Sequence, residues 1–365
     1  MSPGSLIFGG GTQISILDSL IKMPEFSLII PVYNSAQYFL IECLESCINQ
    51  TFNDIEIICI NDCSPDDSYK ILENYAKKDS RIKIITHTQN RKQGGARNTG
   101  ITAATGKYCW FIDNDDSILL NACEILYEVI CKTHADIISF KSINYKYDII
   151  TKQKRIDYTG VLNYHYNTLF TKEDYTKFTM GEVEPWYYIT CTPLLKNNKF
   201  RENVIYEDMD FTPILFSKAN SIYVTNYTLY YRRIHALSIT QASMDTNHIV
   251  NKILAMDVLY HYTISSDLPK FHFCTRILAS FYSDLQTEYK KFPEIHTDEF
   301  DKMLKKASKF KKYFEGDTRL YNSIIDRYGN SQLLEFILKM YRFIIKRISQ
   351  LKKAIDQYVI YCNTN

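Results

Sequence analysis

The sequence is poor in glycine and has no cysteine pair of the kind that binds zinc or exchanges electrons. Only 12 of its 365 residues are glycine, and its ten cysteines include no Cys-x-x-Cys pair. A zinc knuckle and a thioredoxin-like redox motif are therefore not indicated. Several cysteines lie inside apolar runs, such as Cys59 and Cys109. This pattern predicts small buried residues in a reducing cytosol.

Long apolar runs and a dominant charge are also missing. No stretch approaches the roughly 20 apolar residues that cross a bilayer. Lys and Arg number 43 against 41 Asp and Glu, a formal net charge of +2, so no nucleic-acid partner is expected. The first 23 residues lack the basic start of a signal peptide, and glycines interrupt their apolar run. We expect residues 1–23 to be a leader or a remnant of expression.

Two familiar phosphate-binding motifs do not occur: the P-loop pattern Gly-x-x-x-x-Gly-Lys-Ser/Thr and the dinucleotide fingerprint Gly-x-Gly-x-x-Gly. The sequence does contain a regular alternation of apolar runs and helical patterns. Runs that end in turn signals predict buried strands at 26–32, 56–61, 82–86, 107–112 and 136–141. The segments between them carry apolar residues at helical spacing. This order predicts an α/β fold with a Rossmann-like, mostly parallel central sheet and helices on both faces.

The predicted strand ends carry the most polar residues of the first 140. In such sheets ligands bind outside the carboxyl ends of the strands. The strongest group is Asp113-Asn114-Asp115-Asp116, directly after a predicted strand. Carboxylates this close repel one another unless a cation lies among them, and Mg²⁺ or Mn²⁺ takes carboxylate and diphosphate oxygens. The alternative is a solvated turn before a helix; its place at a strand end favours the metal site.

Three weaker features lie at neighbouring strand ends. Asp62 follows the second strand and could accept the N–H of a pyrimidine base, or prepare the cap of the next helix. Tyr33 could stack on a base, or be a surface tyrosine of a loop. The run Gly94-Gly95-Ala96-Arg97-Asn98 begins a helix, where glycines allow a ligand to approach and an arginine favours phosphate.

Two further groups lie beyond residue 200. The acidic run 206–210 could supply a general base for an acceptor hydroxyl, or form the first turn of a helix. Arg232, Arg233 and His235 could neutralise a leaving diphosphate, or form a basic loop after a strand.

Taken in order, these pieces resemble family 2 of the inverting glycosyltransferases, which have the GT-A fold. They are FSLIIPVYN, Asn61-Asp62-x-Ser64, GGARNTGI, WFIDNDD, IYEDMDF and YYRRIHALSIT, spread over residues 26–240. The resemblance implies transfer of one sugar from a nucleotide diphosphate-sugar, here a UDP-sugar, to a hydroxyl of a glycan or lipid-linked glycan acceptor. Relatives of this pattern are bacterial enzymes that build capsule, lipopolysaccharide or other surface polysaccharides.

The resemblance also implies roles for residues of the donor site. Pro31, Tyr33 and Asp62 are expected to hold the uracil-type base and the ribose. Arg97 is expected to fix the nucleotide region, and Asp113 to contact the ribose or the sugar. Family members often have Asp-Asp-Gly-Ser where this chain has Asn61-Asp62-Cys63-Ser64. The turn is therefore more restrained here and has one charge fewer.

The remaining implied roles concern the reaction. Asp115 is expected to ligate Mn²⁺ or Mg²⁺, with His235 at the metal or the diphosphate and Arg233 adding positive charge. Asp208 is expected to be the catalytic base, with Glu207 beside it. These residues predict a single in-line displacement with inversion, in which the metal carries the charge of the leaving group.

Two other classes of protein compete with this interpretation. A sugar-phosphate nucleotidyltransferase shares the sheet and the carboxylate chemistry. It would be expected to carry an early glycine-rich phosphate loop, and the first strand here ends in Pro31-Val32-Tyr33-Asn34 instead. A non-catalytic nucleotide-sugar binder would not need Asp208.

We expect a catalytic domain over residues 24–240, with a nucleotide-sugar half (24–141) and an acceptor half (142–240), followed by a helical region (241–365). Residues 142–180 have weak periodicity and are predicted to be irregular or a hairpin on the acceptor side. Trp186 and Tyr187 are candidates either for stacking on an acceptor sugar or for the core.

The predicted helix 333–356 is strongly basic. Its basic residues are Lys339, Arg342, Lys346, Arg347, Lys352 and Lys353. One interpretation is docking on an anionic membrane surface, where a lipid-linked acceptor would be found. The other is a terminal helix packed on the catalytic domain with its basic side solvated. We expect a cytoplasmic protein, with peripheral contact at the inner face of the cytoplasmic membrane in the first case.

Overall fold

The computed structural model describes residues 23–35, 39–147, 154–160, 166–174, 183–236 and 245–266, and a few positions between 274 and 302. The strands are β1 (Phe26–Val32), β2 (Ile55–Asn61), β3 (Ile82–Thr86), β4 (Tyr108–Phe111), β5 (Ser117–Ile118), β6 (Ile137–Tyr147), β7 (Lys154–Gly160), β8 (Thr168–Thr171), β9 (Tyr188–Cys191) and β10 (Ser221–Ile234). The helices are α2 (Leu40–Ile48), α3 (Ser68–Ala76), α4 (Lys92–Ala103), α5 (Ala122–Thr133), α6 (Thr192–Lys196), α7 (Asp208–Lys218) and α8 (Thr246–Ser265), with short 3₁₀ turns at Lys172–Asp174 and Pro185–Tyr187.

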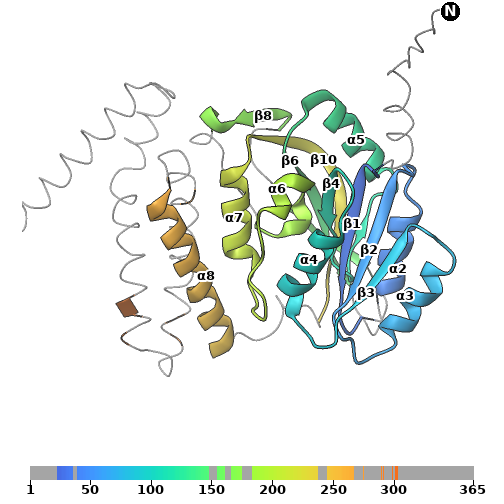
Figure 1. Cartoon of the computed structure of the whole chain (residues 1–365), viewed down its shortest axis with the longest axis horizontal. Coiled ribbons are helices and arrows are strands. Elements are labelled where there is room, and N and C mark those ends of the chain that lie inside the picture. The colour runs from blue at the N-terminus through green and yellow to red at the C-terminus, as the bar shows by residue number, and fades with distance from the viewer. Residues whose placement is uncertain are drawn as a thin grey trace, which may run out of the picture.

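One ten-stranded mixed sheet forms the centre of the molecule, flanked by helices (Figure 1). Its order is β3-β2-β1-β4-β9-β6-β10-β5, with β7 beside β6 and β8 beside β10. The first four strands are mutually parallel, as are β6 and β10, whereas β9 runs antiparallel between β4 and β6. The predicted α/β class is confirmed. The sheet is mixed because β9, β5, β7 and β8 each pair antiparallel with their neighbours.

Two neighbouring parallel strands, β1 and β2, are fully buried. All seven residues of β1 and all seven of β2 are buried. Parallel strands read as continuous apolar runs because elements cover both of their faces. Helix α4 packs on both strands and lies so close that a Cβ at Gly100 would be 2.3 Å from Ile29 Cγ2. The glycine therefore sets the distance between helix and sheet.

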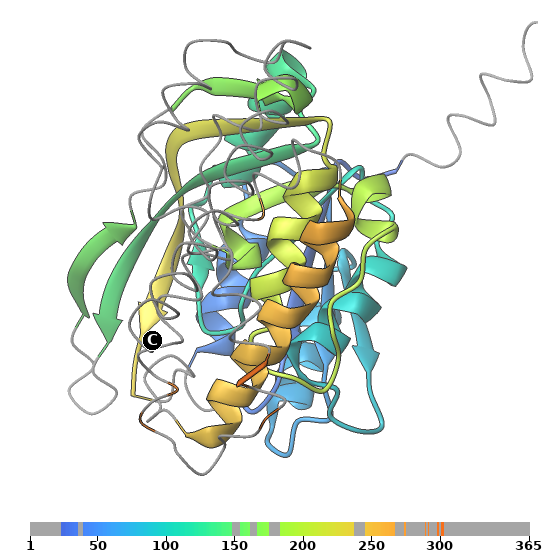
Figure 2. The same cartoon turned by 90° about the vertical axis from the view of Figure 1, so that its left-hand side faces the viewer.

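The strands β6 and β10 are less buried than β1 and β2. Strand β6 continues past the predicted residue 141 and pairs with β7 in an antiparallel ribbon that stands out from the sheet (Figure 2). The hairpin alternative for this region is therefore confirmed for the paired residues 142–147 and 154–160. Buried and half-buried residues follow each other irregularly in the outer part of β6. The sequence there has no clean period of two for that reason.

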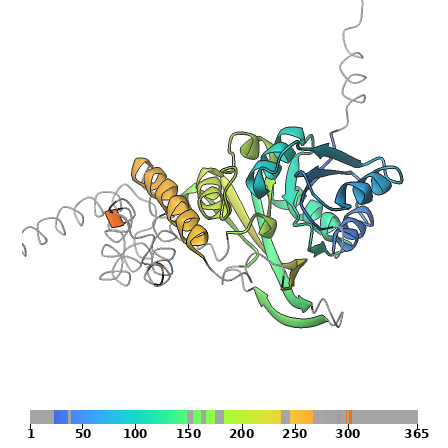
Figure 3. The ribbon, with the colours of Figure 1, turned by 90° about the horizontal axis from the view of Figure 1, so that it is seen from below.

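The chain beyond the sheet is helical where the structure describes it. Helix α8 packs against α7, on the side away from β1–β3 (Figure 3). Residues 1–22 and the basic segment 333–356 lie outside the described residues, so the expectations for them are not addressed. Within the described part of the chain, no helix is both long enough and apolar enough to span a membrane.

The cysteines are not cross-linked in the described chain. Nine of them are free thiols, and six are buried: Cys43, Cys47, Cys59, Cys109, Cys123 and Cys274. For these six the predicted role as small core residues is confirmed. Cys63 and Cys131 are exposed.

Candidate active site

Three polar strand ends meet at one edge of the sheet, as the sequence predicts. Val32 at the end of β1 pairs with Asn61 at the end of β2, and Asn61 pairs with Thr86 of β3. The acidic segment after β4 lies beside them, and the Asn114 side chain donates to the Pro31 carbonyl at 2.8 Å. Hydrogen bonds thus tie the loop after β4 to the end of β1.

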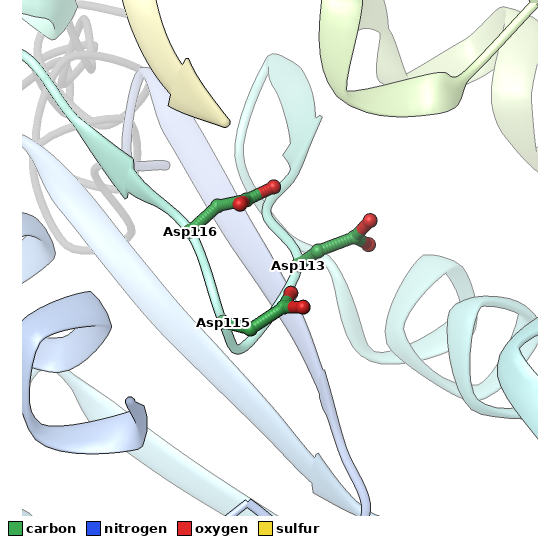
Figure 4. A group of neighbouring side chains, drawn as sticks. All are labelled: Asp113, Asp115 and Asp116. Atoms are coloured by element: carbon green, nitrogen blue, oxygen red, sulfur yellow. The ribbon is translucent and has the colours of Figure 1, made fainter. Parts of the chain in front are cut away.

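The three carboxylates of this loop converge (Figure 4). Asp113, Asp115 and Asp116 each offer an oxygen within 4.8 Å of the others. Burial raises the pKa of Asp116 well above the usual carboxyl range, and the charges of Asp115 and Asp113 raise it further. A cation at this point would relieve that repulsion.

Asp116 anchors the loop to β10. Its carboxylate accepts hydrogen bonds from the Tyr230 hydroxyl at 2.8 Å and from the Arg233 backbone N–H at 2.6 Å. The same hydroxyl accepts from the Asp113 N–H at 3.1 Å. Tyr230 therefore fixes both ends of the acidic turn. Sequence reasoning missed the role of Tyr230, the first residue of the run YYRRIHALSIT, because its partners Asp113 and Asp116 lie more than a hundred residues earlier in the chain.

Asp115 and His235, the two predicted metal ligands, lie side by side. His235 Nε2 is 3.0 Å from Asp115 Oδ2, and the imidazole packs on the Phe39 ring at 4.5 Å between centroids. Asp116 accepts hydrogen bonds from β10 and Asp113 pairs with Arg97, whereas the Asp115 carboxylate faces the His235 imidazole. Mg²⁺ and Mn²⁺ use one or two carboxylates and complete their shell with phosphate and water. The residues present therefore fit such an ion.

Arg97 is buried between the two predicted halves of the site. Its guanidinium donates to Asp113 at 3.0 Å and to Glu207, and the rings of Phe111 and Phe200 lie 6.0 and 5.5 Å from it. Burial disfavours the charged form, but Asp113 and Glu207 outweigh it and raise the pKa of Arg97. The arginine thus stays charged, and its side chain is only 2% exposed.

The glycine pair before Arg97 serves packing between segments. A Cβ at Gly94 would lie 2.0 Å from the carbonyl oxygen of Arg201 and 3.3 Å from Glu207 Cγ. Only glycine lets α4 approach this backbone. The pair was interpreted as an approach for a ligand, and the structure gives Gly94 a different neighbour, the segment that carries Glu207.

Asp208 begins α7 and is half-buried. Burial raises its pKa well above the usual carboxyl range, and the charges of Glu207 and Glu184 raise it further against the opposing charge of Arg97. Glu184 was not predicted from sequence. One of the Glu184 carboxylate oxygens is buried without a hydrogen-bond partner among the described residues. The raised pKa of Asp208 suits that carboxylate to proton transfer near neutral pH.

Asp62 is buried and already engaged. Its carboxylate accepts from the Arg91 N–H at 2.9 Å and lies 2.7 Å from His87 Nδ1, while His87 Nε2 lies 2.8 Å from Thr99 Oγ1. Tyr33 is 49% exposed at the end of β1, where a base could stack. The base contact expected of Asp62 remains a prediction, and it would have to share the carboxylate with Arg91 and His87.

Arg233 has its own partners. Its guanidinium lies 2.7 Å from Glu42 of α2, donates to the Tyr145 hydroxyl at 2.9 Å and lies 4.1 Å from the Phe39 ring centre. It is 3% exposed. A diphosphate at this guanidinium would share it with Glu42 and Tyr145. The contact with a diphosphate remains a prediction.

Trp186 and Tyr187 belong to the core. Both are 2% exposed, and Trp186 is stacked between Tyr187 and Tyr230 with centroids 3.9 and 4.5 Å apart. Of the two alternatives, stacking on an acceptor sugar is therefore excluded in this conformation. Arg232 lies over the same indole at 5.6 Å.

The fold and this acidic edge define a GT-A-like domain. S. aureus TarS (residues 1–349) has a similar structure, with a TM-score of 0.61 and 23% identity over 78% of this chain and 79% of that one. Residues 27–189 match the model of Glycosyl transferase family 2. This part of the chain therefore belongs to glycosyl transferase family 2.

Relatives support the same family. The glycosyltransferase EpsJ of Bacillus subtilis is 32% identical over 231 residues, which are 60% of this chain and 64% of EpsJ. The cholesterol galactosyltransferase of Borreliella burgdorferi is 31% identical over 243 residues, 64% of this chain and 66% of that protein. The chain thus spans just under two thirds of the length of these relatives.

Proposed function

We propose that this protein is a metal-dependent, inverting glycosyltransferase that moves a sugar from a UDP-sugar to an acceptor hydroxyl. One observation carries the proposal: Arg97 joins the metal-fitting edge at Asp113 to Glu207, the neighbour of the half-buried Asp208. A donor-binding edge and a candidate base thus belong to one connected site. Membership in family 2 supports the class of reaction.

Each group has a defined task in this proposal. Asp115 and His235 would hold Mg²⁺ or Mn²⁺, which supplies Lewis-acid stabilisation of the diphosphate leaving group. Asp113 would contact the ribose or the sugar, and Asp62 with the exposed Tyr33 would hold the base. Pro31, whose carbonyl accepts a hydrogen bond from Asn114, would lie beside the base. UDP is the first nucleotide to test because TarS was crystallised with UDP-GlcNAc.

Asp208 would take the proton of the acceptor hydroxyl as that oxygen attacks the anomeric carbon. Attack by the acceptor oxygen from the side opposite the leaving diphosphate inverts the configuration at that carbon. The acceptor is proposed to be a glycan or lipid-linked glycan of a bacterial surface polysaccharide. For the lipid-linked case we propose work at the inner face of the cytoplasmic membrane.

A thermal-shift screen of nucleoside diphosphates and UDP-sugars, with and without Mn²⁺, tests the donor site. A ligand at about 100 times its Kd should add ~2.7 kcal/mol to the stability of the native state. A Mn²⁺-dependent shift with UDP, followed by release of UDP from a UDP-sugar, supports the proposal. If the protein binds a UDP-sugar but releases no UDP from it with any acceptor tried, the result would favour a non-catalytic nucleotide-sugar binder. No shift with any nucleotide contradicts the donor site.

A further inference from the structure

Arg97 connects carboxylates from opposite sides of the site without touching the candidate base. Its Nη2 donates to Asp113 at 3.0 Å, and its Nη1 donates to Glu207. Among the described contacts none joins Arg97 to Asp208 directly. The charge of Arg97 does act on the pKa of Asp208. The contact through which Arg97 can position Asp208 is its hydrogen bond to Glu207, the preceding residue.

The turn that carries Asp208 is held in an uncommon conformation. Tyr206 has a φ of 59°, in the left-handed region that a tyrosine rarely adopts. Arg201 holds the backbone of this turn, because its Nη2 donates to the Tyr206 carbonyl at 3.1 Å and its Nε to Asp210 at 2.8 Å. Strained turns persist only where their surroundings over-determine them.

Arg201 and Arg97 restrain different parts of that turn. Arg201 reaches the residues on either side of the pair 207–208, whereas Arg97 holds the Glu207 side chain. The Glu207 side chain is only 5% exposed, and that of Arg97 is 2% exposed. Two buried partners in a dry environment have little freedom to move. Gly94 packs near the same side chain, since a Cβ at this position would lie 3.3 Å from Glu207 Cγ.

We propose that Arg97 is a positioning residue: through Glu207 it sets the direction of Asp208, and through Asp113 it fixes that direction relative to the donor edge. This inference rests on the proposed function. It differs from the role expected from sequence, in which Arg97 contacts the nucleotide. The two roles make opposite predictions, because a nucleotide contact affects donor binding and a positioning residue affects turnover.

A double-mutant cycle separates the two roles. The variants are R97K, E207Q and R97K/E207Q. R81K is the matched control, because Arg81 forms a partly buried ion pair with Asp79 at another place in the molecule. R97K keeps the charge without the fork that spans two carboxylates, and E207Q keeps the shape of Glu207. The measurements are kcat and KM for UDP release from the UDP-sugar that the wild type turns over, and the Kd of UDP by calorimetry.

We expect each single variant to lower kcat by about 10²-fold, the effect of a displacement of about 1 Å. The Kd of UDP should stay nearly unchanged, and the double variant should be no slower than the slower single one, because both remove the same linkage. R81K should behave as wild type. The thermal midpoint of each variant is recorded to show that it is folded at the assay temperature.

Three results would overturn the inference. Losses in kcat that multiply in the double variant would show that Arg97 and Glu207 act independently. A higher Kd for UDP with unchanged kcat would show that Arg97 contacts the nucleotide instead. A wild type that releases UDP from no UDP-sugar would remove the proposed function first, and the positioning role with it.

Discussion

The two halves of the site are built in different ways. The donor edge lies on parallel strands that are buried along their whole length, such as β1 and β2. The proposed acceptor side lies at the start of α7, which follows a strained turn. A rigid edge suits binding, because its groups need no rearrangement. The proposed acceptor side instead depends on single side chains, chiefly Arg97 and Arg201, to hold the proposed base.

This comparison predicts that substitutions on the proposed acceptor side lower kcat, whereas substitutions at the donor edge weaken the binding of UDP. Asp208→Asn should give the largest effect, a fall in kcat of about 10²- to 10⁴-fold, since the general base is lost. The Kd of UDP with Mn²⁺ should remain that of the wild type. Asp67→Asn, an exposed carboxylate at the start of α3, is the control. Near wild-type turnover in Asp208→Asn would remove the base assignment.

The donor edge can be tested in the same assay. Asp115→Ala should weaken the Mn²⁺-dependent binding of UDP, on the order of 10- to 100-fold by analogy with the loss of groups that support a metal site. Binding of UDP without metal should change little. Calorimetry with UDP at several Mn²⁺ concentrations provides the measurement. An unchanged Kd at every Mn²⁺ concentration would show that Asp115 holds no ion.

The pH dependence of kcat reports on Asp208 directly. Its pKa is raised by burial first and then by Glu207 and Glu184. A base works only when deprotonated, so turnover should be lost as the pH falls through this raised pKa. Glu184→Gln removes one repelling charge and lowers the pKa of Asp208, so the acidic limb of the profile should move to lower pH. A limb that stays in place or moves upward would contradict the placement of Glu184 beside Asp208.

The donor half could be predicted closely from sequence and the acceptor half only in part. Continuous apolar runs mark buried parallel strands, so β1, β2 and the acidic residues after β4 were predicted with nearly correct bounds. The group 113–116 can be recognised in the sequence because its residues are consecutive. Tyr230 and Glu184 are not, because each acts on residues that are distant in the chain. The partners of Arg97 could not be predicted for the same reason: Glu207 is 110 residues away.

The strained turn after β2 offers the smallest effect and the one that needs no substrate. Cys63 has a φ of 58° at the position where related sequences often have glycine. A non-glycine residue in this region costs roughly 1–2 kcal/mol, against roughly 0.5–1 kcal/mol for the greater freedom of glycine in the unfolded chain. Cys63→Gly should therefore stabilise the protein by up to about 1 kcal/mol, measured by urea unfolding monitored by circular dichroism. Cys63→Ala keeps the strain and loses only the weak contact of the thiol with the Thr88 carbonyl at 3.7 Å, so it should give no gain.

Equal stability of Cys63→Gly and Cys63→Ala would show that the turn relaxes without glycine. A gain confined to Cys63→Gly, with an unchanged Kd for UDP, would show that the donor edge is rigid enough to hold Asp62 in place whether or not its neighbour is strained.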